Sequence, residues 1–197
     1  MRDVICLVGC GFLGSHLTDQ LDKLMYSQEL GACFRLRLID YDTWDERNPA
    51  NQFVTLSEAI KRAPKVETLA ARVEAYGLTC EPREEKLEAS NAASLLEDAF
   101  LIIDAVDHVP TRQLLWGISR GTNTPCIHLG ISKRGTGQVT WSCKTFDDFP
   151  YTPQAVGGRK MINDDKVKEP PCEMFKYMYA GLRTVEAGLK SISLFFG

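Results

Sequence analysis

The chain has 197 residues, of which 44% are hydrophobic and 25% charged, and its formal net charge is −3. This length suits one domain with a sizeable hydrophobic core, and the mild acidity gives no reason to expect nucleic acid or a membrane as a partner. No stretch approaches the roughly 18 apolar residues that a membrane-spanning helix needs. The N-terminus lacks the pattern of a signal peptide, so we expect a cytoplasmic protein.

The seven cysteines include no Cys-x-x-Cys pair. Zinc ribbons and thioredoxin-type sites are built on such pairs, so no zinc is expected. Most of the cysteines are expected to be small core residues in a reducing compartment.

The chain begins with an apolar run, Val4–Val8, which ends at a glycine and is typical of a buried parallel strand. Leucines at helical spacing then predict a helix over 12–25. A second strand is expected over 34–39. A polar segment separates it from a helix over 64–76, which begins at a proline and ends before a glycine.

The rest of the chain continues this alternation. Strands are expected over 79–82, 99–104, 125–130 and 135–142. Helices are expected over 92–97, 109–120 and 173–196. Alternating strands and helices favour a parallel sheet, so we predict a single-domain α/β fold, Rossmann-like and doubly wound, with a mainly parallel sheet and helices on both faces.

Three parts of this domain are distinguished by composition. Residues 1–144 are expected to form an ATP-binding Rossmann-like core, and residues 172–197 a C-terminal helix that packs on it. Between them, residues 145–171 are polar, lack an apolar period and form a crossover loop. This loop is longer than most connectors, so it is either functional or disordered.

The first strand is followed by Gly9, Gly11 and Gly14, with Phe12 at the start of the helix. In a glycine-rich strand-to-helix turn the first glycine allows the tight turn, the second lets a phosphate approach the backbone, and the third lets helix and strand pack closely. The free N–H groups of the helix then attract an anion. This context favours nucleotide binding by these residues over a purely structural turn.

Acidic residues follow the second and fourth strands. Asp40 stands where an acid bonds the ribose of a nucleotide, and Asp42 follows it; the alternative for both is a solvated turn. Asp104 ends the fourth strand, and Asp107 follows in the nucleotide crevice. A carboxylate beside a triphosphate holds Mg²⁺, so Asp107 is either a magnesium ligand or a cap of the next helix.

Four segments share one order with a known family: GCGFLGS, DYDTWDERNPANQF, APKVETLAARV and IIDAVDHVPTR. Over residues 4–131 they resemble the ThiF/MoeB/ubiquitin-activating-enzyme superfamily of adenylyltransferases. The stretch from Glu186 to Lys190 is similar to the closing Glu-Ala-x-Lys stretch of that family.

The resemblance implies an enzyme that binds ATP and Mg²⁺. Such enzymes adenylate the C-terminal glycine of a ubiquitin-like or sulfur-carrier protein and release pyrophosphate, and members are often homodimers. By position, the three glycines cradle the nucleotide, Asp40 holds the ribose, Asn48 and Lys65 reach the phosphates, and Asp107 binds magnesium. A lysine in the first turn of a helix is electrostatically unfavourable, which favours a phosphate-binding Lys65 over a solvated one.

The sequence also departs from the family. Asn51 stands where the family has a phosphate-contacting arginine, so this charge is either lost or supplied by Arg47, Lys61 or Arg62. Cys172 precedes the last helix, where a thiolate is activated. It is either a catalytic cysteine that accepts the activated carboxyl group or its sulfur, or an ordinary loop cysteine.

We therefore expect a ThiF-type adenylyltransferase that acts on a protein or peptide C-terminus. One alternative is a non-catalytic, nucleotide-binding scaffold, which the asparagine at position 51 favours. The other is an NAD(P)-dependent oxidoreductase. The set Asp40, Asp42, Lys65 and Asp107 argues against it, because hydride transfer needs no magnesium ligand.

Overall fold

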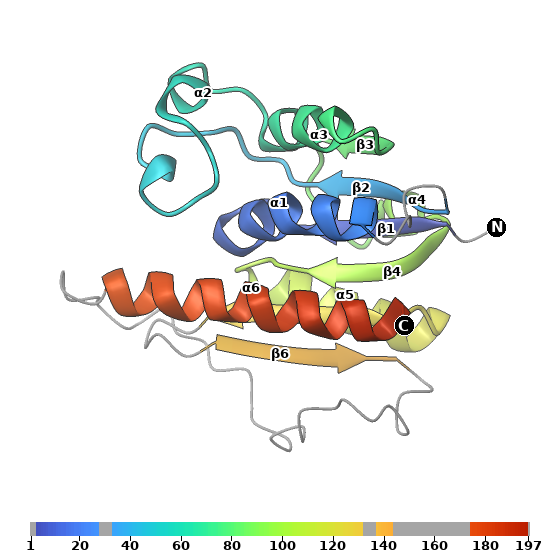
Figure 1. The fold of residues 1–197 in the computed structure, drawn as a ribbon. Coiled ribbons are helices and arrows are strands. Elements are labelled where there is room, and N and C mark those ends of the chain that lie inside the picture. Colours follow the sequence, from blue (N-terminus) through green and yellow to red (C-terminus); the bar gives the residue numbers. More distant parts are fainter. Residues whose placement is uncertain (1–2, 28–32, 132–136, 144–173, 197) are drawn as a thin grey trace.

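A computed structural model of the chain describes residues 3–27, 33–131, 137–143 and 174–196 (Figure 1). The described residues contain a sheet with the strand order β3-β2-β1-β4-β5-β6. The strands are β1 (Val4–Val8), β2 (Arg35–Ile39), β3 (Cys80–Arg83), β4 (Ala99–Asp104), β5 (Cys126–Ile131) and β6 (Gly137–Ser142). All neighbours pair in parallel except β5 and β6, which are antiparallel.

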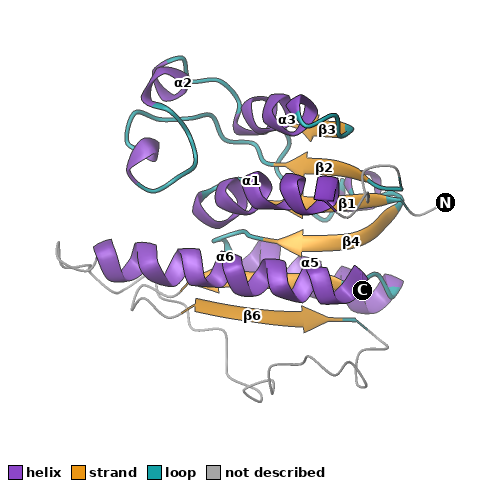
Figure 2. Ribbon diagram, in the orientation of Figure 1, coloured by secondary structure: helices purple, strands orange, loops and turns teal. Residues whose placement is uncertain are grey.

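Helices cover both faces of this sheet (Figure 2). They are α1 (Phe12–Ser27), η2 (Asn48–Ala50), α2 (Leu56–Ile60), α3 (Lys65–Ala75), α4 (Ala92–Leu95), α5 (Val109–Thr122) and α6 (Met174–Phe196). Helices α1, α3 and α6 pack on one face, and α4 and α5 pack on the other. The predicted doubly wound α/β fold is therefore confirmed. No helix among the described residues is long and apolar enough to cross a bilayer.

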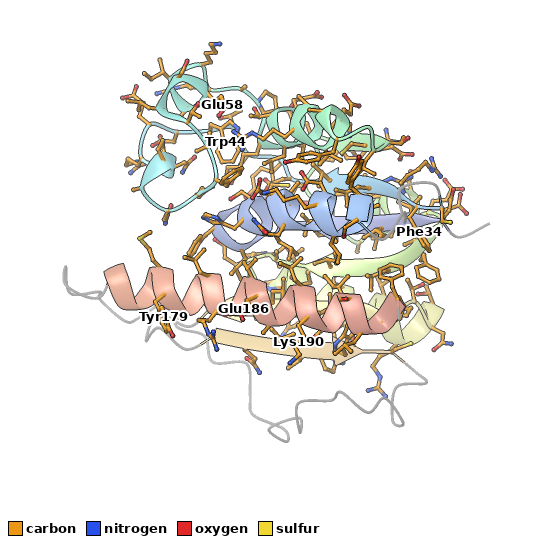
Figure 3. All side chains as sticks on the ribbon, in the orientation of Figure 1. Phe34, Trp44, Glu58, Tyr179, Glu186 and Lys190 are labelled. Atoms are coloured by element: carbon orange, nitrogen blue, oxygen red, sulfur yellow. The ribbon has the colours of Figure 1, made fainter. Side chains whose placement is uncertain are left out.

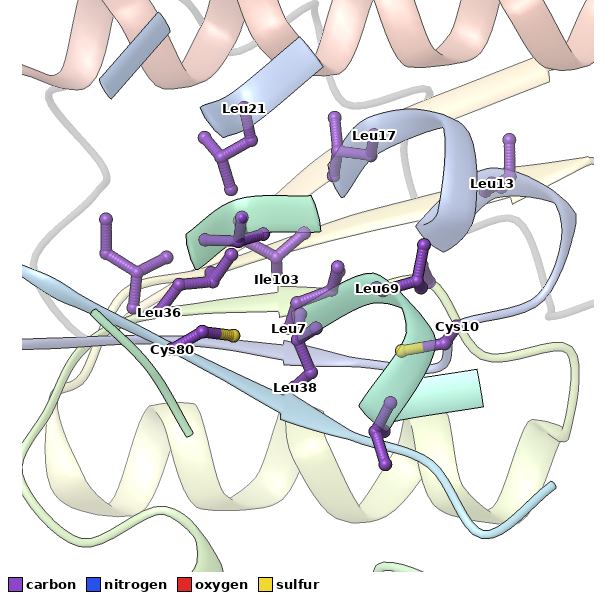
Figure 4. Close-up of a cluster of buried hydrophobic side chains, with 14 of the residues drawn as sticks. Leu7, Cys10, Leu13, Leu17, Leu21, Leu36, Leu38, Leu69, Cys80 and Ile103 are labelled. Atoms are coloured by element: carbon purple, nitrogen blue, oxygen red, sulfur yellow. The ribbon is translucent and has the colours of Figure 1, made fainter. Parts of the chain in front are cut away.

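Each central strand contributes to two cores, because successive side chains point to opposite faces of a sheet. In β1, Ile5 and Leu7 belong to the core under α1 and α3, whereas Val4, Cys6 and Val8 belong to the core under α4 and α5. Burial on both faces explains why these strands are continuously apolar rather than alternating. Figure 4 shows part of the first core. Its labelled members include Leu13, Leu17 and Leu21 of α1, Leu69 of α3, Leu38 of β2 and Ile103 of β4.

The long helix α6 follows the helical period on its buried side. Thr184, Val185 and Ile192 are buried, whereas Glu186 and Lys190 are exposed (Figure 3). Its C-terminal end meets an aromatic cluster at the edge of the sheet where β1 begins. This cluster consists of Phe34, Phe100, Trp141, Phe195 and Phe196.

The predicted strands and long helices match the structure within a few residues, but no helix is predicted in the polar segment after β2. It contains η2 and α2, which are too short to show an apolar period. Helix α2 is stabilised instead by a capping box between Thr55 and Glu58. Pro64 is the N-cap of α3, so Lys65 is its first residue. The predicted crossover loop, 145–171, lies outside the described residues.

The parallel strands all end at the same edge of the sheet, the left edge in Figure 1. The chain leaves β1 toward β2 on one side, and β4 lies on the other side. Ligands bind in open α/β sheets at such a reversal of strand order. The predicted site residues follow β1, β2 and β4, so they belong to this edge.

Candidate functional site

The glycine-rich turn after β1 contains two glycines that the chain itself requires. Gly9 has a φ of +91°, and a Cβ there would lie 2.9 Å from the carbonyl group of Ala105. A Cβ at Gly14 would overlap the carbonyl oxygen of Gly9. Gly11 is different, because a Cβ there would meet nothing within 4 Å. The packing of the chain therefore explains Gly9 and Gly14 but leaves open space at Gly11.

That open space lies at the start of α1. The N–H of Ser15 donates to the carbonyl oxygen of Gly11 at 2.9 Å, so the hydrogen bonds of the helix begin there. The first N–H groups of a helix have no acceptor within the helix and carry a positive dipole end. Open space in front of such donors fits a phosphate group. The turn therefore fits the nucleotide cradle predicted from the sequence.

Phe12 is part of this turn, but its ring is turned away from it. The ring packs against α6, where a Cβ at Gly181 would overlap it. It also meets the ring of His16 edge-on, with the ring centres 5.3 Å apart. Any contact of Phe12 with a nucleotide would therefore be made by its main chain.

Asp40 connects the end of β2 to the glycine-rich turn. Its Oδ2 accepts a hydrogen bond from the N–H of Cys10 at 2.6 Å, and its Oδ1 accepts one from the N–H of Asp42 at 2.9 Å. Burial raises the pKa of Asp40, and these two hydrogen bonds oppose that rise. Each carboxylate oxygen keeps a further lone pair, so Asp40 can still accept hydrogen bonds from ribose hydroxyls.

Lys65 is buried, and this burial makes the alternative of a solvated surface lysine wrong. Its side chain is only 7% exposed, and its Nζ lies 3.1 Å from Oδ2 of Asp42. The Nζ also lies 5.8 Å from the ring centre of Trp44. A buried ammonium at a helix N-terminus is costly unless a negative group compensates it. In the described structure the half-exposed carboxylate of Asp42 is that group.

A pocket of about 290 Å³ lies beside this ion pair. It is lined by Asp42, Thr43, Trp44, Asp45, Asn48, Arg62 and Lys65. Three predicted site residues, Asp42, Asn48 and Lys65, therefore meet in one pocket. Asp40 links this pocket to the glycine-rich turn through its two hydrogen bonds.

Asn48 begins the short helix η2 at the wall of this pocket. Its Oδ1 accepts a hydrogen bond from the N–H of Asp45 at 2.7 Å. An asparagine amide also carries two N–H donors, and among the described residues these have no acceptor. Asn48 therefore has donors left for a phosphate oxygen.

Residue 51 is asparagine, and three cations could supply the charge that the family's arginine has at this position. They differ in where the structure places them. Arg47 is exposed and pairs with Asp45 at 2.8 Å. Arg62 lines the pocket, whereas Lys61 does not. The carbonyl oxygen of Asn51 lies 3.2 Å from Nε2 of His16, so this residue serves to connect its segment to α1. Of the three cations, Arg62 is thus the one that lines the pocket.

The segment that carries these residues is fixed on both sides. On the α1 side, Oγ of Ser15 accepts a hydrogen bond from the N–H of Phe53 at 3.0 Å. On the α3 side, Arg72 donates to the carbonyl oxygen of Phe53 at 2.6 Å and pairs with Glu58 at 2.6 Å. Trp44 and Glu58 are labelled in this segment in Figure 3. These contacts hold the pocket wall in one place.

Asp107 lies in the loop between β4 and α5, which passes close to Gly9. It is exposed, and among the described residues it forms no hydrogen bond or ion pair. The N-cap of α5 is His108, whose Nδ1 lies 3.0 Å from Oγ1 of Thr111. The alternative of Asp107 as the helix cap is therefore wrong, and the Asp107 side chain is exposed in the loop that passes Gly9.

The described residues contain no group of three or more His, Cys, Asp or Glu that could hold a metal ion. Magnesium with a bound nucleotide commonly needs only one or two carboxylates, because phosphates and water complete its shell. A single free carboxylate such as Asp107 fits that arrangement. Cys172, the predicted catalytic cysteine, lies outside the described residues.

Arg112 and His128 are not predicted as site residues, but the structure places both against Asp104 behind the Asp107 loop. Arg112 appears in the sequence as one charge on an amphipathic helix, and His128 as one polar residue in an apolar strand. No spacing pattern connects them, because they meet only when α5 and β5 pack beside β4.

Known proteins resemble this chain in sequence and in fold. The family model of ThiF matches residues 2–156. The chain is 28% identical over 138 residues to the SAMP-activating enzyme E1 of Haloferax volcanii, covering 69% of this chain and 48% of that protein. It is 30% identical over 138 residues to the adenylyltransferase and sulfurtransferase MOCS3 of Danio rerio, covering 69% and 28%. The chain thus spans about half the length, or less, of these curated relatives.

Solved structures show the same fold at low sequence identity. The structure of PaaA superposes with a TM-score of 0.61 at 20% identity, covering 98% of this chain and 64% of that chain. The structure of the E. coli tRNA N6-threonylcarbamoyladenosine dehydratase TcdA superposes with a TM-score of 0.56 at 22% identity, covering 66% and 53%. At these identities the likeness concerns the fold alone.

Proposed function

The chain belongs to the ThiF family, and we propose that it binds ATP with Mg²⁺ and adenylates the C-terminal carboxylate of a ubiquitin-like or sulfur-carrier protein or peptide. The names of its relatives, an E1 activating enzyme and an adenylyltransferase, support this class of reaction. The observation that carries the proposal is the buried lysine, Lys65. It lies in a pocket that Asp40 joins to the glycine-rich turn.

In the proposed reaction an oxygen of the partner's carboxylate attacks the α-phosphorus of ATP. A new bond forms between that oxygen and phosphorus, and the bond between the α-phosphorus and the oxygen bridging to the β-phosphate breaks. An acyl adenylate and pyrophosphate result. The nucleophile is already an anion at neutral pH, so no general base is required. Catalysis is then mainly a matter of positioning two anions and neutralising charge.

The described residues suit these tasks. The open space at Gly11 and the first N–H groups of α1 would receive a phosphate, and Asp40 would accept hydrogen bonds from the ribose. Lys65, Arg62 and the amide of Asn48 would face the remaining phosphate oxygens in the pocket. Asp107 would hold Mg²⁺, which supplies positive charge to the phosphates when it is bound.

Calorimetry tests the nucleotide first. The protein should bind ATP in the presence of Mg²⁺ and should not bind NAD⁺ with comparable affinity. Tight binding of NAD⁺ without binding of ATP would refute the proposal in favour of an oxidoreductase.

Pyrophosphate exchange tests the reaction itself. In the presence of a carrier protein that ends in glycine, labelled pyrophosphate should enter ATP. A second candidate, a nucleotide-binding scaffold without activity, is favoured by the asparagine at position 51 and by Arg47, which pairs with Asp45 and does not line the pocket. Binding of ATP without exchange against a panel of such carriers would select the scaffold.

A further inference from the structure

A buried network of charged and polar groups lies directly behind the Asp107 loop. Asp104, the last residue of β4, is fully buried. Its Oδ1 accepts a hydrogen bond from the N–H of Val106 at 3.0 Å. Its Oδ2 lies 2.7 Å from Nδ1 of His128 and 3.3 Å from Nε of Arg112. The carboxylate thus joins β4, the loop, β5 and α5 at one point.

Arg112 of α5 provides the second half of this arrangement. Its Nη2 donates to the carbonyl oxygen of Leu129 in β5 at 2.7 Å and also donates to the carbonyl oxygen of Val106. Gly130 leaves room for the guanidinium group, because a Cβ there would lie 2.9 Å from Nη1 of Arg112. The guanidinium therefore occupies one position, between two strands and the loop.

The two charged groups together hold Val106 at both ends. Asp104 binds the N–H of Val106, and Arg112 binds its carbonyl oxygen. That carbonyl belongs to the peptide bond that leads into Asp107. Among the described residues the Asp107 side chain has no contact that fixes it, so the position from which its carboxylate extends depends on this peptide bond.

His128 completes the support of Asp104. Its Nε2 lies 2.7 Å from Oγ of Ser142, and the ring of Trp116 stacks on it with the ring centres 5.0 Å apart. The order serine, histidine, aspartate resembles that of a hydrolytic triad. However, Ser142 is only 4% exposed and His128 only 2%. No substrate reaches such a hydroxyl, so the chain of hydrogen bonds serves to hold the carboxylate.

Burying a carboxylate and a guanidinium stabilises a fold little, because desolvation offsets most of their attraction. The network therefore calls for another role, and its two hydrogen bonds to the backbone of Val106, just before Asp107, indicate which. We propose that Arg112 and Asp104 are positioning residues that fix the Asp107 loop, and with it the carboxylate that receives Mg²⁺. This inference rests on the proposed function for the metal, but its geometric part concerns the loop alone.

Two variants disturb the network in different ways. Arg112→Lys keeps the positive charge but loses the fork of donors that reaches Val106 and Leu129 together. Gly130→Ala keeps every charged group and displaces the guanidinium through the added methyl group. Arg120→Lys, on an exposed residue in the last turn of the same helix, is the matched control.

Hydrogen exchange and calorimetry read out the result on the folded variants. Both network variants should speed amide exchange in residues 105–108. Mg²⁺ should increase the ATP affinity of the wild type by a larger factor than that of either network variant. We expect this factor to be about tenfold smaller in the variants, as for groups that orient a metal ligand. Affinity for ATP without Mg²⁺ should change less than about twofold, because the glycine-rich turn is intact. Arg120→Lys should match the wild type in all three measurements.

Unchanged exchange and an unchanged Mg²⁺ effect in either folded network variant would overturn the inference. A general loosening of the fold would speed exchange throughout the sheet, and this outcome would overturn it as well. If the wild type bound no ATP, the proposed function would fail. Exchange in residues 105–108 would then still decide whether Arg112 holds the loop.

Discussion

The replacement of Lys65 by methionine tests the nucleotide site most directly. Methionine keeps an unbranched apolar side chain at this buried position and removes the ammonium group. The variant should fold, because the carboxylate left behind, Asp42, is 49% exposed and can be hydrated. Loss of an ion pair with such an exposed partner costs about 0–1 kcal/mol of folding stability.

The expected loss of ATP affinity follows from the same geometry. A hydrogen bond from an ammonium group to a phosphate contributes about 1.5–3 kcal/mol. In the free protein Lys65 already pairs with Asp42 at 3.1 Å, so up to about 1 kcal/mol of this is offset by the bond given up. The net loss is about 0.5–3 kcal/mol, which corresponds to about a 2- to 150-fold weaker affinity.

Calorimetric titration with ATP and Mg²⁺ measures this loss, and thermal unfolding checks the fold. Lys61→Met, which removes an exposed lysine outside the pocket, is the matched control and should bind ATP like the wild type. A folded Lys65→Met variant with wild-type affinity would refute the reasoning, because it would show that the ammonium group does not meet the phosphates.

Three further predictions concern the glycine-rich turn, the magnesium ligand and a buried carboxyl group. Gly14→Ala should lower Tm strongly, because its Cβ would overlap the backbone of Gly9. Gly11→Ala should leave Tm nearly unchanged and weaken ATP binding. Equal Tm values for the two variants would contradict the division into a packing glycine and a phosphate-binding glycine. Asp107→Asn should abolish the gain in ATP affinity from Mg²⁺ without changing Tm, and a retained Mg²⁺ effect would exclude this ligand. Burial raises the pKa of Asp22 from 3.8 to about 6, so folding stability falls as the pH rises through this range. Asp22→Asn should therefore raise the free energy of unfolding by about 3 kcal/mol at pH 7.5 and by much less near pH 4 in denaturant titrations, and an equal gain at both pH values would disprove the shift.

The strands, the long helices and the glycine-rich turn can be predicted from the sequence, because each depends on local patterns. Val4–Val8 is continuously apolar because both of its faces are buried, and the leucines of α1 recur with the helical period. The spacing of Gly9, Gly11 and Gly14 follows from the turn that joins strand and helix. The short elements η2 and α2 were missed because two turns or fewer leave no period to detect.

For the candidate site too, some features could be predicted from the sequence and others only from the tertiary structure. Strand ends, which meet at one edge of a parallel sheet, pointed to Asp40 and Asp107, and the resemblance to the adenylyltransferase family pointed to Lys65. Only the tertiary structure decided that Lys65 is buried against Asp42, that Asp107 does not cap α5, and that Arg62 rather than Lys61 lines the pocket. It alone revealed the contacts behind Asp107. Burial of a side chain and its pairing with a distant element depend on how the elements pack. Such contacts produce no periodic pattern in the sequence.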